Sequence, residues 1–311
     1  MKISLIVPCY NEENNIEPFY NESEKVFCKS GYELEYVFVN DGSCDLTAKN
    51  LKKLCNENNS NFRIISFARN FGKEAAIYAG LSYASGDYIC IIDADLQQRP
   101  EYALQMANIL DKEPDIDCVG AYPEKRKEFF VKALFKNVFY KLINLVSETP
   151  FKHGVSDFRM FRTNVKDAIL QMKEYHRFSK GIFAWVGFEN KYIPYKVMER
   201  KSGKTKWSFI KLCKYAINGI TDYSAKPLYL SSVLGGLFAT GGFAYYIVAL
   251  VIFLMKKGYS PNALICATVF FVGGVVLGCI GITGAYLVKM YFQVKQRPIY
   301  ITKEIIEKEK E

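Results

Sequence analysis

Acidic side chains follow the ends of short apolar runs in the first hundred residues. Asp93 and Asp95 come directly after the run 88–92, and Asp41 follows the run 36–39. Two carboxylates two positions apart, where the chain leaves a strand, can hold a Mg²⁺ or Mn²⁺ ion that bridges phosphate oxygens. A lone Asp-x-Asp is also typical of a solvated turn. Carboxylates gathered at neighbouring strand ends repel one another unless a cation or ligand compensates, which favours the metal site.

The elements that must position these side chains alternate along residues 1–200. Apolar runs at 3–7, 36–39, 63–66 and 88–92 are typical of buried parallel strands, and the segments 13–30, 46–58 and 74–85 are long enough for helices. This alternation predicts a doubly wound α/β sheet with its ligand at the carboxyl ends of the strands. The sequence contains neither Gly-x-Gly-x-x-Gly nor a complete Gly-x-x-x-x-Gly-Lys-Ser/Thr, which argues against a dinucleotide site or a P-loop.

The composition excludes a disordered chain, a collagen and a many-spanning transporter, since 311 residues are 50% hydrophobic and 23% charged with mean hydropathy −0.02. The net charge of +9 indicates an acidic partner: nucleic acid, a phosphorylated ligand or an anionic membrane. Nine cysteines without a Cys-x-x-Cys pair predict buried thiols in a reducing compartment, and two histidines are too few for a His-based metal site. The apolar N-terminal run is too short for a signal peptide.

Two long uncharged segments show that the average hydropathy combines a polar part of the chain with a strongly apolar part. Residues 227–255 and 258–288 contain no charged side chain, and each exceeds the roughly 20 residues that a membrane-spanning helix needs. Buried helices of a soluble core are the alternative, but such helices rarely run so far without a charge. Both segments are rich in glycine, as close helix packing in lipid allows, and they predict a transmembrane hairpin. More lysines and arginines flank the hairpin than lie in its turn, so both termini are expected in the cytosol.

Six motifs in order make residues 1–207 resemble a family 2 glycosyltransferase with the GT-A fold, of the polyprenyl-phosphate type that includes bactoprenol glucosyltransferases and dolichyl-phosphate mannose synthases. The C-terminal hairpin resembles the bactoprenol glucosyltransferase type. The matching segments are Val-Pro-Cys-Tyr-Asn-Glu-Glu at 7–13, Asn-Asp-Gly-Ser at 40–43, Arg-Asn-Phe-Gly-Lys-Glu-Ala-Ala at 69–76, Gly-Asp at 86–87 with Asp-Ala-Asp-Leu-Gln at 93–97, Ser-Asp-Phe-Arg at 156–159 and Arg-x-x-Gly-x-Thr-Lys-Trp at 200–207.

The resemblance implies a nucleotide-sugar site. It assigns the base and ribose pocket to Pro8, Tyr10, Glu12 and Asp41, and it assigns the diphosphate and its metal to the loop that begins at Asp93. Asn stands at position 40, where many family members have Asp. Lys73, at the start of a predicted helix, adds a positive charge where a helix N-terminus already favours anions. The expected nucleotide-sugar residues are Pro8, Tyr10, Glu12, Asp41, Lys73, Asp93, Ala94, Asp95 and Gln97, with Asp95, Asp93 and Gln97 as the metal or phosphate contacts.

Asp157 and four cations complete the expected catalytic site. A polyprenyl phosphate is already an anion at neutral pH, so we expect Asp157 to orient groups around the acceptor and the anomeric carbon rather than to act as a general base. A capping Asp in a turn is the alternative. Paired cations would offset the repulsion between the acceptor phosphate and the leaving diphosphate. The expected cations are Arg126, Arg159, Arg200 and Lys206.

The sequence divides into four parts: a cytosolic catalytic domain at 1–207, which contains an amphipathic interface helix at about 129–146, an amphipathic juxtamembrane helix at 208–226, two transmembrane helices within 227–289 and a cytosolic tail at 290–311. Lysines alternate with apolar residues in both amphipathic helices, which suits an anionic membrane surface, although packing on the soluble domain or on another subunit is the alternative. Charges alternate along 302–311, which we interpret as a solvated helix or a frayed end.

The function that follows is inverting transfer of a hexose, with UDP-glucose as the favoured donor, to undecaprenyl phosphate at the cytosolic face of a bacterial plasma membrane, for cell-envelope glycosylation. A processive polysaccharide synthase is one alternative, but its Gln-x-x-Arg-Trp block and additional spans are absent from the sequence. A non-catalytic scaffold that binds a nucleotide sugar is another, which the two acidic motifs disfavour. No nucleic-acid module is recognisable, and the glycine-rich hairpin could pack between subunits of a homo-oligomer.

Overall fold

The computed structural model describes residues 1–124, 156–175, 177–197 and 261–310, together with scattered helical residues between 228 and 251. These residues fall into two compact units. One contains the described residues up to Val197 and those from Arg297 onward, and the other contains the helical residues between 228 and 296.

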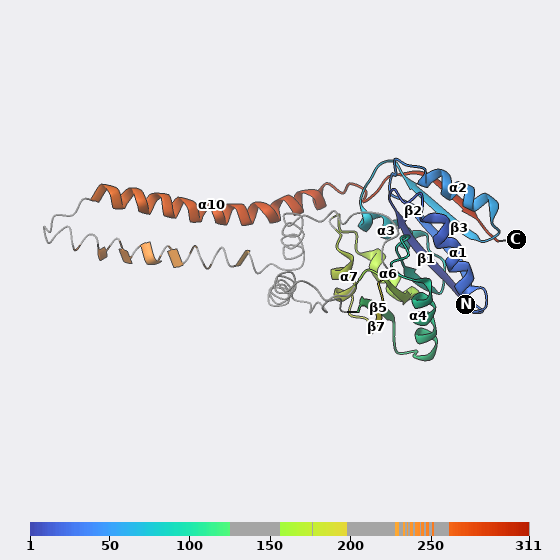
Figure 1. Ribbon diagram of the computed structural model, residues 1–311. Coiled ribbons are helices and arrows are strands. Elements are labelled where there is room, and N and C mark those ends of the chain that lie inside the picture. Colours follow the sequence, from blue (N-terminus) through green and yellow to red (C-terminus); the bar gives the residue numbers. More distant parts are fainter. Residues whose placement is uncertain are drawn as a thin grey trace. The chain divides into compact units, whose positions relative to one another are not determined.

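The first unit is built on an eight-stranded mixed sheet with the order β7-β5-β6-β4-β1-β2-β3-β8 (Figure 1). Its centre, β3-β2-β1-β4, is parallel; β6 and β8 are antiparallel to their central neighbours β4 and β3, while β5 runs antiparallel to β6 and parallel to β7. The strands are β1 (Lys2–Cys9), β2 (Glu33–Asn40), β3 (Asn61–Phe67), β4 (Tyr88–Ile91), β5 (Cys118–Pro123), β6 (Arg159–Arg162), β7 (Asn190–Tyr195) and β8 (Thr302–Lys308).

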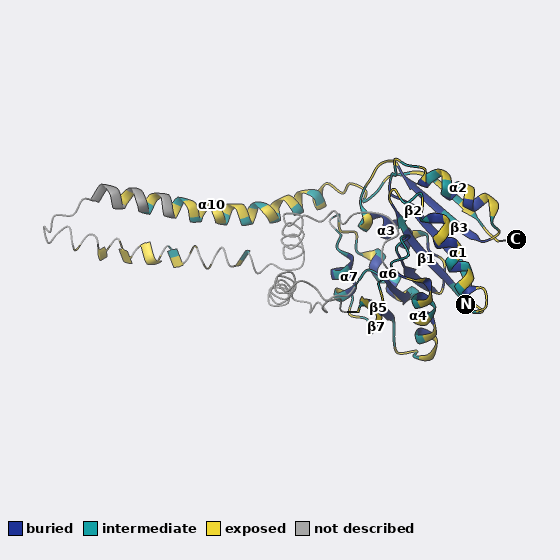
Figure 2. Cartoon of the chain, in the orientation of Figure 1, coloured by how far each residue is buried: buried dark blue, intermediate teal, exposed yellow. Residues whose placement is uncertain are grey.

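Helices cover both faces of this sheet, and its strands form the buried core (Figure 2). Helix α1 packs against α2 and α4, whereas α3 packs against β1, β2 and α6. The four predicted strands and three predicted helices are confirmed, because their apolar periodicity is local and strong. The helices of this unit are α1 (Ile16–Phe27), α2 (Thr47–Glu57), α3 (Lys73–Tyr83), α4 (Pro100–Lys112), α6 (Thr163–Gln171) and α7 (Ser179–Trp185).

The tail that was expected to be a solvated helix or a frayed end is instead strand β8, so that prediction is wrong. Ile306 and Ile305 of β8 lie opposite Ile64 and Ile65 of β3, so that β8 covers an edge of the sheet. Burial alternates along β8 with a period of two, because successive side chains of a strand point to opposite faces. Its sequence, with two charged residues on either side of two isoleucines, fits a strand as well as a solvated tail, and only the distant partner β3 decides between them.

The second unit contains α10 (Pro261–Val294), whose residues 272–294 form a stretch long and apolar enough to cross a membrane. It is the one such helix in the part of the chain that the structure describes. The predicted span at 258–288 therefore falls largely on this helix, which continues past the predicted end. The described residues of the other predicted span, 227–255, are helical. Of the predicted turn at 256–262, residues 256–260 lie outside the described residues and 261–262 begin α10.

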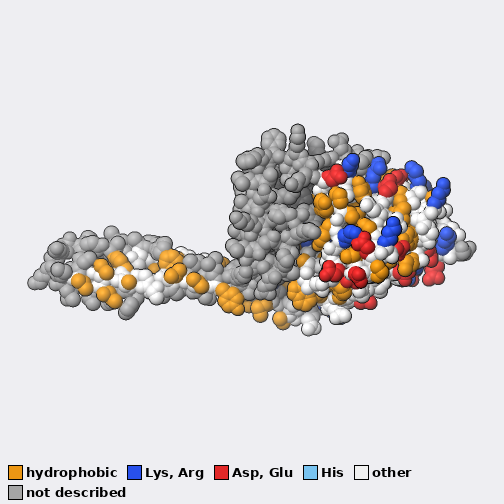
Figure 3. Space-filling view, turned by 90° about the horizontal axis from the view of Figure 1, so that it is seen from below, with side chains coloured by type: hydrophobic (Ala, Val, Ile, Leu, Met, Phe, Trp, Pro, Cys, Tyr) orange, Lys and Arg blue, Asp and Glu red, His pale blue; other side chains and the backbone are white. Residues whose placement is uncertain are grey.

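Charged side chains of both signs lie side by side over the α/β unit on the face seen in Figure 3. Lys and Arg alternate with Asp and Glu there, and hydrophobic side chains lie between them. On that face the charges of the described residues therefore form no single basic patch.

A buried carboxylate lies near the amino ends of the parallel strands. Glu35 is 1% exposed and accepts hydrogen bonds from the hydroxyl of Ser4, from the amide and hydroxyl of Ser85 at 2.9 and 2.7 Å, and from Arg63 Nε at 3.1 Å. Burial alone would raise the pKa of Glu35, but these hydrogen bonds and the charge of Lys2 outweigh it and hold the pKa below its ordinary value.

We expect Glu35→Gln to lower the free energy of unfolding at pH 7 by about 2 kcal/mol, because it removes a hydrogen-bonded charge. Since folding lowers the pKa of Glu35, its stabilisation is complete above the ordinary glutamate pKa and is lost as the pH falls through the folded value. Urea unfolding at a series of pH values should show a weaker acid dependence in the variant. Glu33→Gln, at an exposed position of the same strand, is the control. An unchanged acid dependence in Glu35→Gln would contradict the lowered pKa of Glu35 in the folded protein.

Candidate active site

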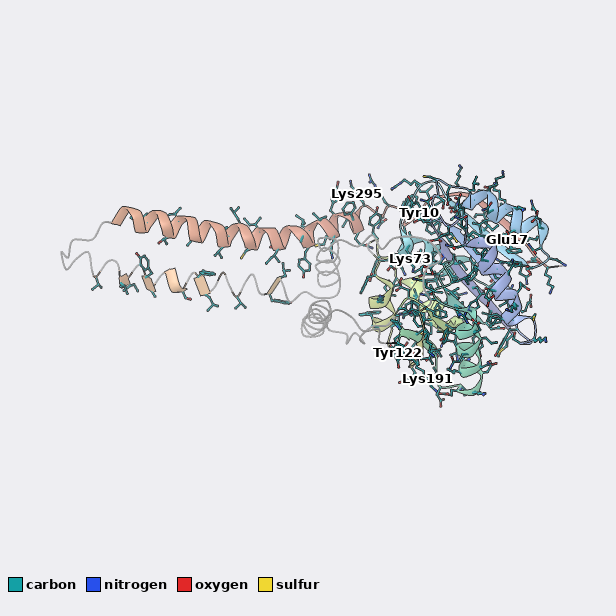
Figure 4. All side chains as sticks on the ribbon, viewed as in Figure 1. Tyr10, Glu17, Lys73, Tyr122, Lys191 and Lys295 are labelled. Carbon is teal, nitrogen blue, oxygen red and sulfur yellow. The ribbon has the colours of Figure 1, made fainter. Side chains whose placement is uncertain are left out.

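The loops that follow β1 and β2 are joined to each other by side-chain hydrogen bonds. The amide of Asn11 donates to Ser43 Oγ at 3.0 Å, and the amide of Cys44 donates to Asn11 Oδ1 at 2.9 Å. Asn11 has a φ of 56°, a left-handed conformation that asparagine tolerates better than most residues. These contacts fix the turn beside Tyr10, whose side chain is 47% exposed and is labelled in Figure 4. A ring held in this way can stack on a ligand.

The other residues expected around the base are nearby in the chain. Pro8 lies opposite Val39 in the β1–β2 ladder, and the amide of Glu12 donates to Thr47 Oγ1 at 2.9 Å. The structure therefore brings the residues after β1 against the residues after β2, as the motif order predicts.

Asp41 holds the loop after β3, which comprises residues 68–72. Its carboxylate accepts the amide hydrogen of Phe71 at 2.7 Å and that of Gly72 at 3.0 Å, and the residue is 3% exposed. Burial raises the pKa of Asp41, and the two amide hydrogen bonds lower it less. Gly72 has a φ of 97° and directly precedes α3. Asp41 thus positions the start of α3 through these two hydrogen bonds, a role that the motif did not suggest.

Gly42 has no room for a side chain. Its φ is +65°, and a Cβ would lie 2.4 Å from the backbone carbon of Arg69 and 2.6 Å from the nitrogen of Asn70. We expect Gly42→Ala to lower the free energy of unfolding by about 3 kcal/mol, through left-handed strain plus a backbone clash, and to weaken nucleotide binding. Gly187→Ala, with φ +71° and a Cβ that would lie 3.9 Å from the Trp185 carbonyl oxygen, should cost only about 1 kcal/mol. Equal melting temperatures for the two variants would contradict the clash.

The acidic loop comprises residues 93–98, after β4. The amide of Asp93 donates to Gln98 Oε1 at 3.0 Å, and the amide of Gln97 donates to Asp95 Oδ1 at 3.1 Å. Leu96 has a φ of 57°, a conformation that an apolar residue adopts only when its surroundings impose it. Gln98 is buried and was not among the predicted site residues, although it directly follows the acidic motif. The loop is therefore closed by its own side chains and presents both carboxylates in a fixed turn.

Lys73 joins two of the predicted acidic residues. Its Nζ lies 2.6 Å from Asp93 Oδ1 and 3.6 Å from Asp157 Oδ2 (Lys73 is labelled in Figure 4). Burial disfavours its charge, but Asp93 and Asp157 outweigh this and raise the pKa of Lys73 above its ordinary value. The structure thus brings together the acidic loop, the Ser-Asp-Phe-Arg motif and the start of α3.

Three cations act on Asp157. Although burial raises the pKa of Asp157, the charges of Lys73, Lys180 and Arg159 outweigh it and hold the pKa below its ordinary value. Its Oδ1 is buried, and no hydrogen bond reaches this atom from the described residues. A carboxylate with a lowered pKa is a weak base at neutral pH, which agrees with an orienting role.

Arg159 lies beneath the site rather than on its surface. It is 5% exposed, its guanidinium lies 3.9 Å from the ring centre of Phe183, and its Nη2 donates to the carbonyl of Ser156 at 3.2 Å. Its predicted role was to bind phosphate. In the structure it stabilises the turn that carries Asp157 and lends that carboxylate a positive charge.

Glu74 connects α3 to α7. Its carboxylate accepts hydrogen bonds from the amide of Ser179, at 2.9 Å, and from the Ser179 hydroxyl. This contact anchors the first turn of α7, where Lys180 follows. Glu74 belongs to the recognised motif at 69–76 and could have been found there, whereas Lys180 lies in no motif and its place depends on the tertiary fold.

The acidic loop fits a divalent metal ion that is held by protein carboxylates together with substrate phosphates. Among the described residues, no three His, Cys, Asp or Glu side chains come together as a ready-made metal cage. Mg²⁺ is commonly held by one or two carboxylates together with substrate phosphates, and Asp93 and Asp95 supply such a pair. Gln97 joins this loop through its backbone amide, which donates to Asp95 Oδ1. The predicted cations Arg126, Arg200 and Lys206, and the predicted helices 129–146 and 208–226, lie outside the described residues.

The mixed sheet, with the Asp-x-Asp loop and Asp157 gathered at its strand ends, has the arrangement that the resemblance to a GT-A glycosyltransferase implies. The chain belongs to glycosyltransferase family 2: the model of that family, described as glycosyl transferase family 2, matches residues 4–170.

Comparisons over the whole chain agree with this family. The chain is 38% identical to CsbB of Bacillus subtilis (strain 168), over 97% of its own length and 91% of that protein. It is 36% identical to the prophage bactoprenol glucosyl transferase homolog of Escherichia coli (strain K12), over 98% of its own length and 99% of that protein. A solved mannosyltransferase, PcManGT from Pyrobaculum calidifontis, aligns with 18% identity and a TM-score of 0.49, over 93% of this chain and 84% of that one. The family model and the two relatives make the protein an enzyme that transfers a sugar.

Proposed function

We propose that the protein transfers glucose from UDP-glucose to undecaprenyl phosphate and so makes a lipid-linked sugar for cell-envelope glycosylation. The observation that carries the proposal is the Lys73 ion-pair cluster, which holds Asp93 of the acidic loop and Asp157 around one ammonium group. Relatives named bactoprenol glucosyl transferase, 36% identical over nearly the full chain, support the choice of sugar and carrier.

The chemistry is a single displacement at the anomeric carbon. An oxygen of the lipid phosphate attacks C1 from the side opposite the diphosphate, the bond from C1 to the β-phosphate oxygen breaks, and its electron pair leaves with UDP. Asp157 stays ionised and orients the acceptor, because the phosphate needs no general base. Lys73 supplies a fixed positive charge at the N-terminus of α3, which favours anions. A Mg²⁺ or Mn²⁺ ion held by Asp93 and Asp95 would stabilise the charge that develops on the diphosphate.

Chain connectivity supports a membrane hairpin with the catalytic unit on the cytosolic side. Strand β8 lies in the same sheet as β1, so the parts of the chain before and after the apolar segments lie on one side of a bilayer. The chain between them must then cross the bilayer an even number of times. If α10 spans the bilayer, a second crossing is required, and the uncharged segment 227–255 is the candidate. The excess of flanking lysines and arginines places that side in the cytosol.

The proposal is tested by incubating membranes that contain the protein with undecaprenyl phosphate and, in separate reactions, with labelled UDP-glucose, UDP-galactose, UDP-N-acetylglucosamine and GDP-mannose. Label should enter the lipid fraction from UDP-glucose, only when the acceptor is added, and should be lost when divalent metal is chelated. Lipid labelling from a different donor would overturn the choice of sugar. No lipid labelling from any donor would overturn the function.

A further inference from the structure

An aromatic residue that follows α10 in the chain packs at the end of β3. The ring of Tyr300 stacks on Phe67 with a centroid distance of 4.8 Å and an interplanar angle of 18°, and lies 6.5 Å from the ring of Tyr78 in α3. Beside it, the amide of Ala68 donates to the carbonyl of Ile301 at 2.9 Å. Residues 300–301 therefore contact the end of β3, the first residue of the 68–72 loop and the helix that follows the loop.

The same loop carries the groups that build the nucleotide-sugar site. Phe67 contacts Tyr300 on one side and packs edge-to-face against Phe71, at a centroid distance of 5.7 Å. The amide of Phe71 is the closer of the two that hold Asp41, and Lys73 follows two residues later. A continuous series of contacts thus runs from Tyr300 through Phe67 and Phe71 to Asp41.

Strand β8 has its own attachments, so the ring of Tyr300 is not needed to hold it in the sheet. Lys308 Nζ donates to the carbonyls of Cys55 and Asn58, each at 2.9 Å, and Lys52 lies 2.7 Å from the carboxylate of Glu304. These contacts are with α2 and the residues after it, away from the 68–72 loop.

We propose that Tyr300 is a positioning residue of the donor site, which holds the 68–72 loop in the geometry that Asp41 and Lys73 require. The inference rests on the proposed function, because it takes the ligand of this loop to be a nucleotide sugar. Tyr300 follows Val294, the last residue of α10, by only six positions. A short segment of chain therefore connects the apolar helix to the residue that contacts the donor-site loop. The family model ends at residue 170 and does not include this segment.

The test compares three variants of the full-length protein in nanodiscs. Tyr300→Ala should raise the KM for the donor and the Kd for UDP, measured by calorimetry, by about tenfold while leaving the KM for the lipid acceptor unchanged. Tyr300→Phe keeps the ring and should keep both the KM for the donor and the Kd for UDP at their wild-type values. Lys308→Ala removes two hydrogen bonds from the other end of β8, so it should lower the melting temperature without changing either donor value.

Two results would overturn the inference, and they differ in what else they imply. Wild-type donor KM and UDP affinity in Tyr300→Ala, with a lowered melting temperature, would show that the ring only stabilises the fold. If the wild-type protein binds no UDP and uses no nucleotide sugar, the proposed function fails, and the inference fails with it.

Discussion

Replacing Asp95 with Asn should lower kcat for sugar transfer by about a thousandfold. Asparagine keeps the Oδ1 atom that accepts the amide hydrogen of Gln97, so the acidic loop should keep its turn. What is lost is the negative charge that a divalent ion and the diphosphate require, an effect of several kcal/mol on the barrier. Initial rates over a series of Mg²⁺ and Mn²⁺ concentrations measure this loss.

Asp87→Asn is the matched control for Asp95→Asn. Asp87 directly precedes β4, at the end of the strand opposite to the acidic loop. Its carboxylate accepts the amide hydrogen of Lys2 at 2.8 Å. This control should retain the wild-type rate. If Asp95→Asn kept more than a tenth of the wild-type kcat, the acidic loop would not be the place where the diphosphate charge is stabilised.

Lys73→Met should have the second-largest effect, a loss of about a hundredfold in kcat. The substitution leaves Asp93 and Asp157 without the ammonium group that they share, so the two carboxylates repel each other and the acidic loop loses its link to α3. Removing this charge also raises the pKa of Asp157 toward its ordinary value. Single-turnover rates, compared with the affinity for UDP, separate the loss in the chemical step from any loss in binding.

Lys166→Met controls for the loss of a lysine elsewhere in the unit. Lys166 donates to the carbonyl of Ala84 at 3.2 Å and lies 3.8 Å from Asp167, so it too has an acidic neighbour, but outside the site. Its rate should stay at the wild-type level. A wild-type single-turnover rate in Lys73→Met would show that the cluster serves stability alone.

The central sheet and the acidic loop could be predicted from the sequence because their signals are local. The run 88–92 predicted a strand, and the structure has β4 at Tyr88–Ile91, with Asp93 two residues after its end. The convergence of Asp93 and Asp157 could be expected only from the resemblance to a known family, since these residues are far apart in the chain. The structure adds the ammonium group that connects them.

What the sequence could not reveal depends on partners that are distant in the chain. The sequence of β8, with two charged residues on either side of two isoleucines, fits a solvated tail equally well until β3 is placed beside it. Lys180 acts on Asp157 only because Glu74 anchors the first turn of α7. Tyr300 would pass for an ordinary aromatic residue, because nothing near it in the sequence points to Phe67.

The identity of the two products tests the central claim most directly. Purified protein, UDP-glucose, undecaprenyl phosphate and Mn²⁺ should yield UDP and a lipid that carries hexose on a single phosphate, in equal amounts, by mass spectrometry of the lipid and chromatography of the nucleotide. UMP together with a diphosphate-linked lipid would show that the protein transfers a sugar phosphate. That result would contradict attack of the lipid phosphate at the anomeric carbon.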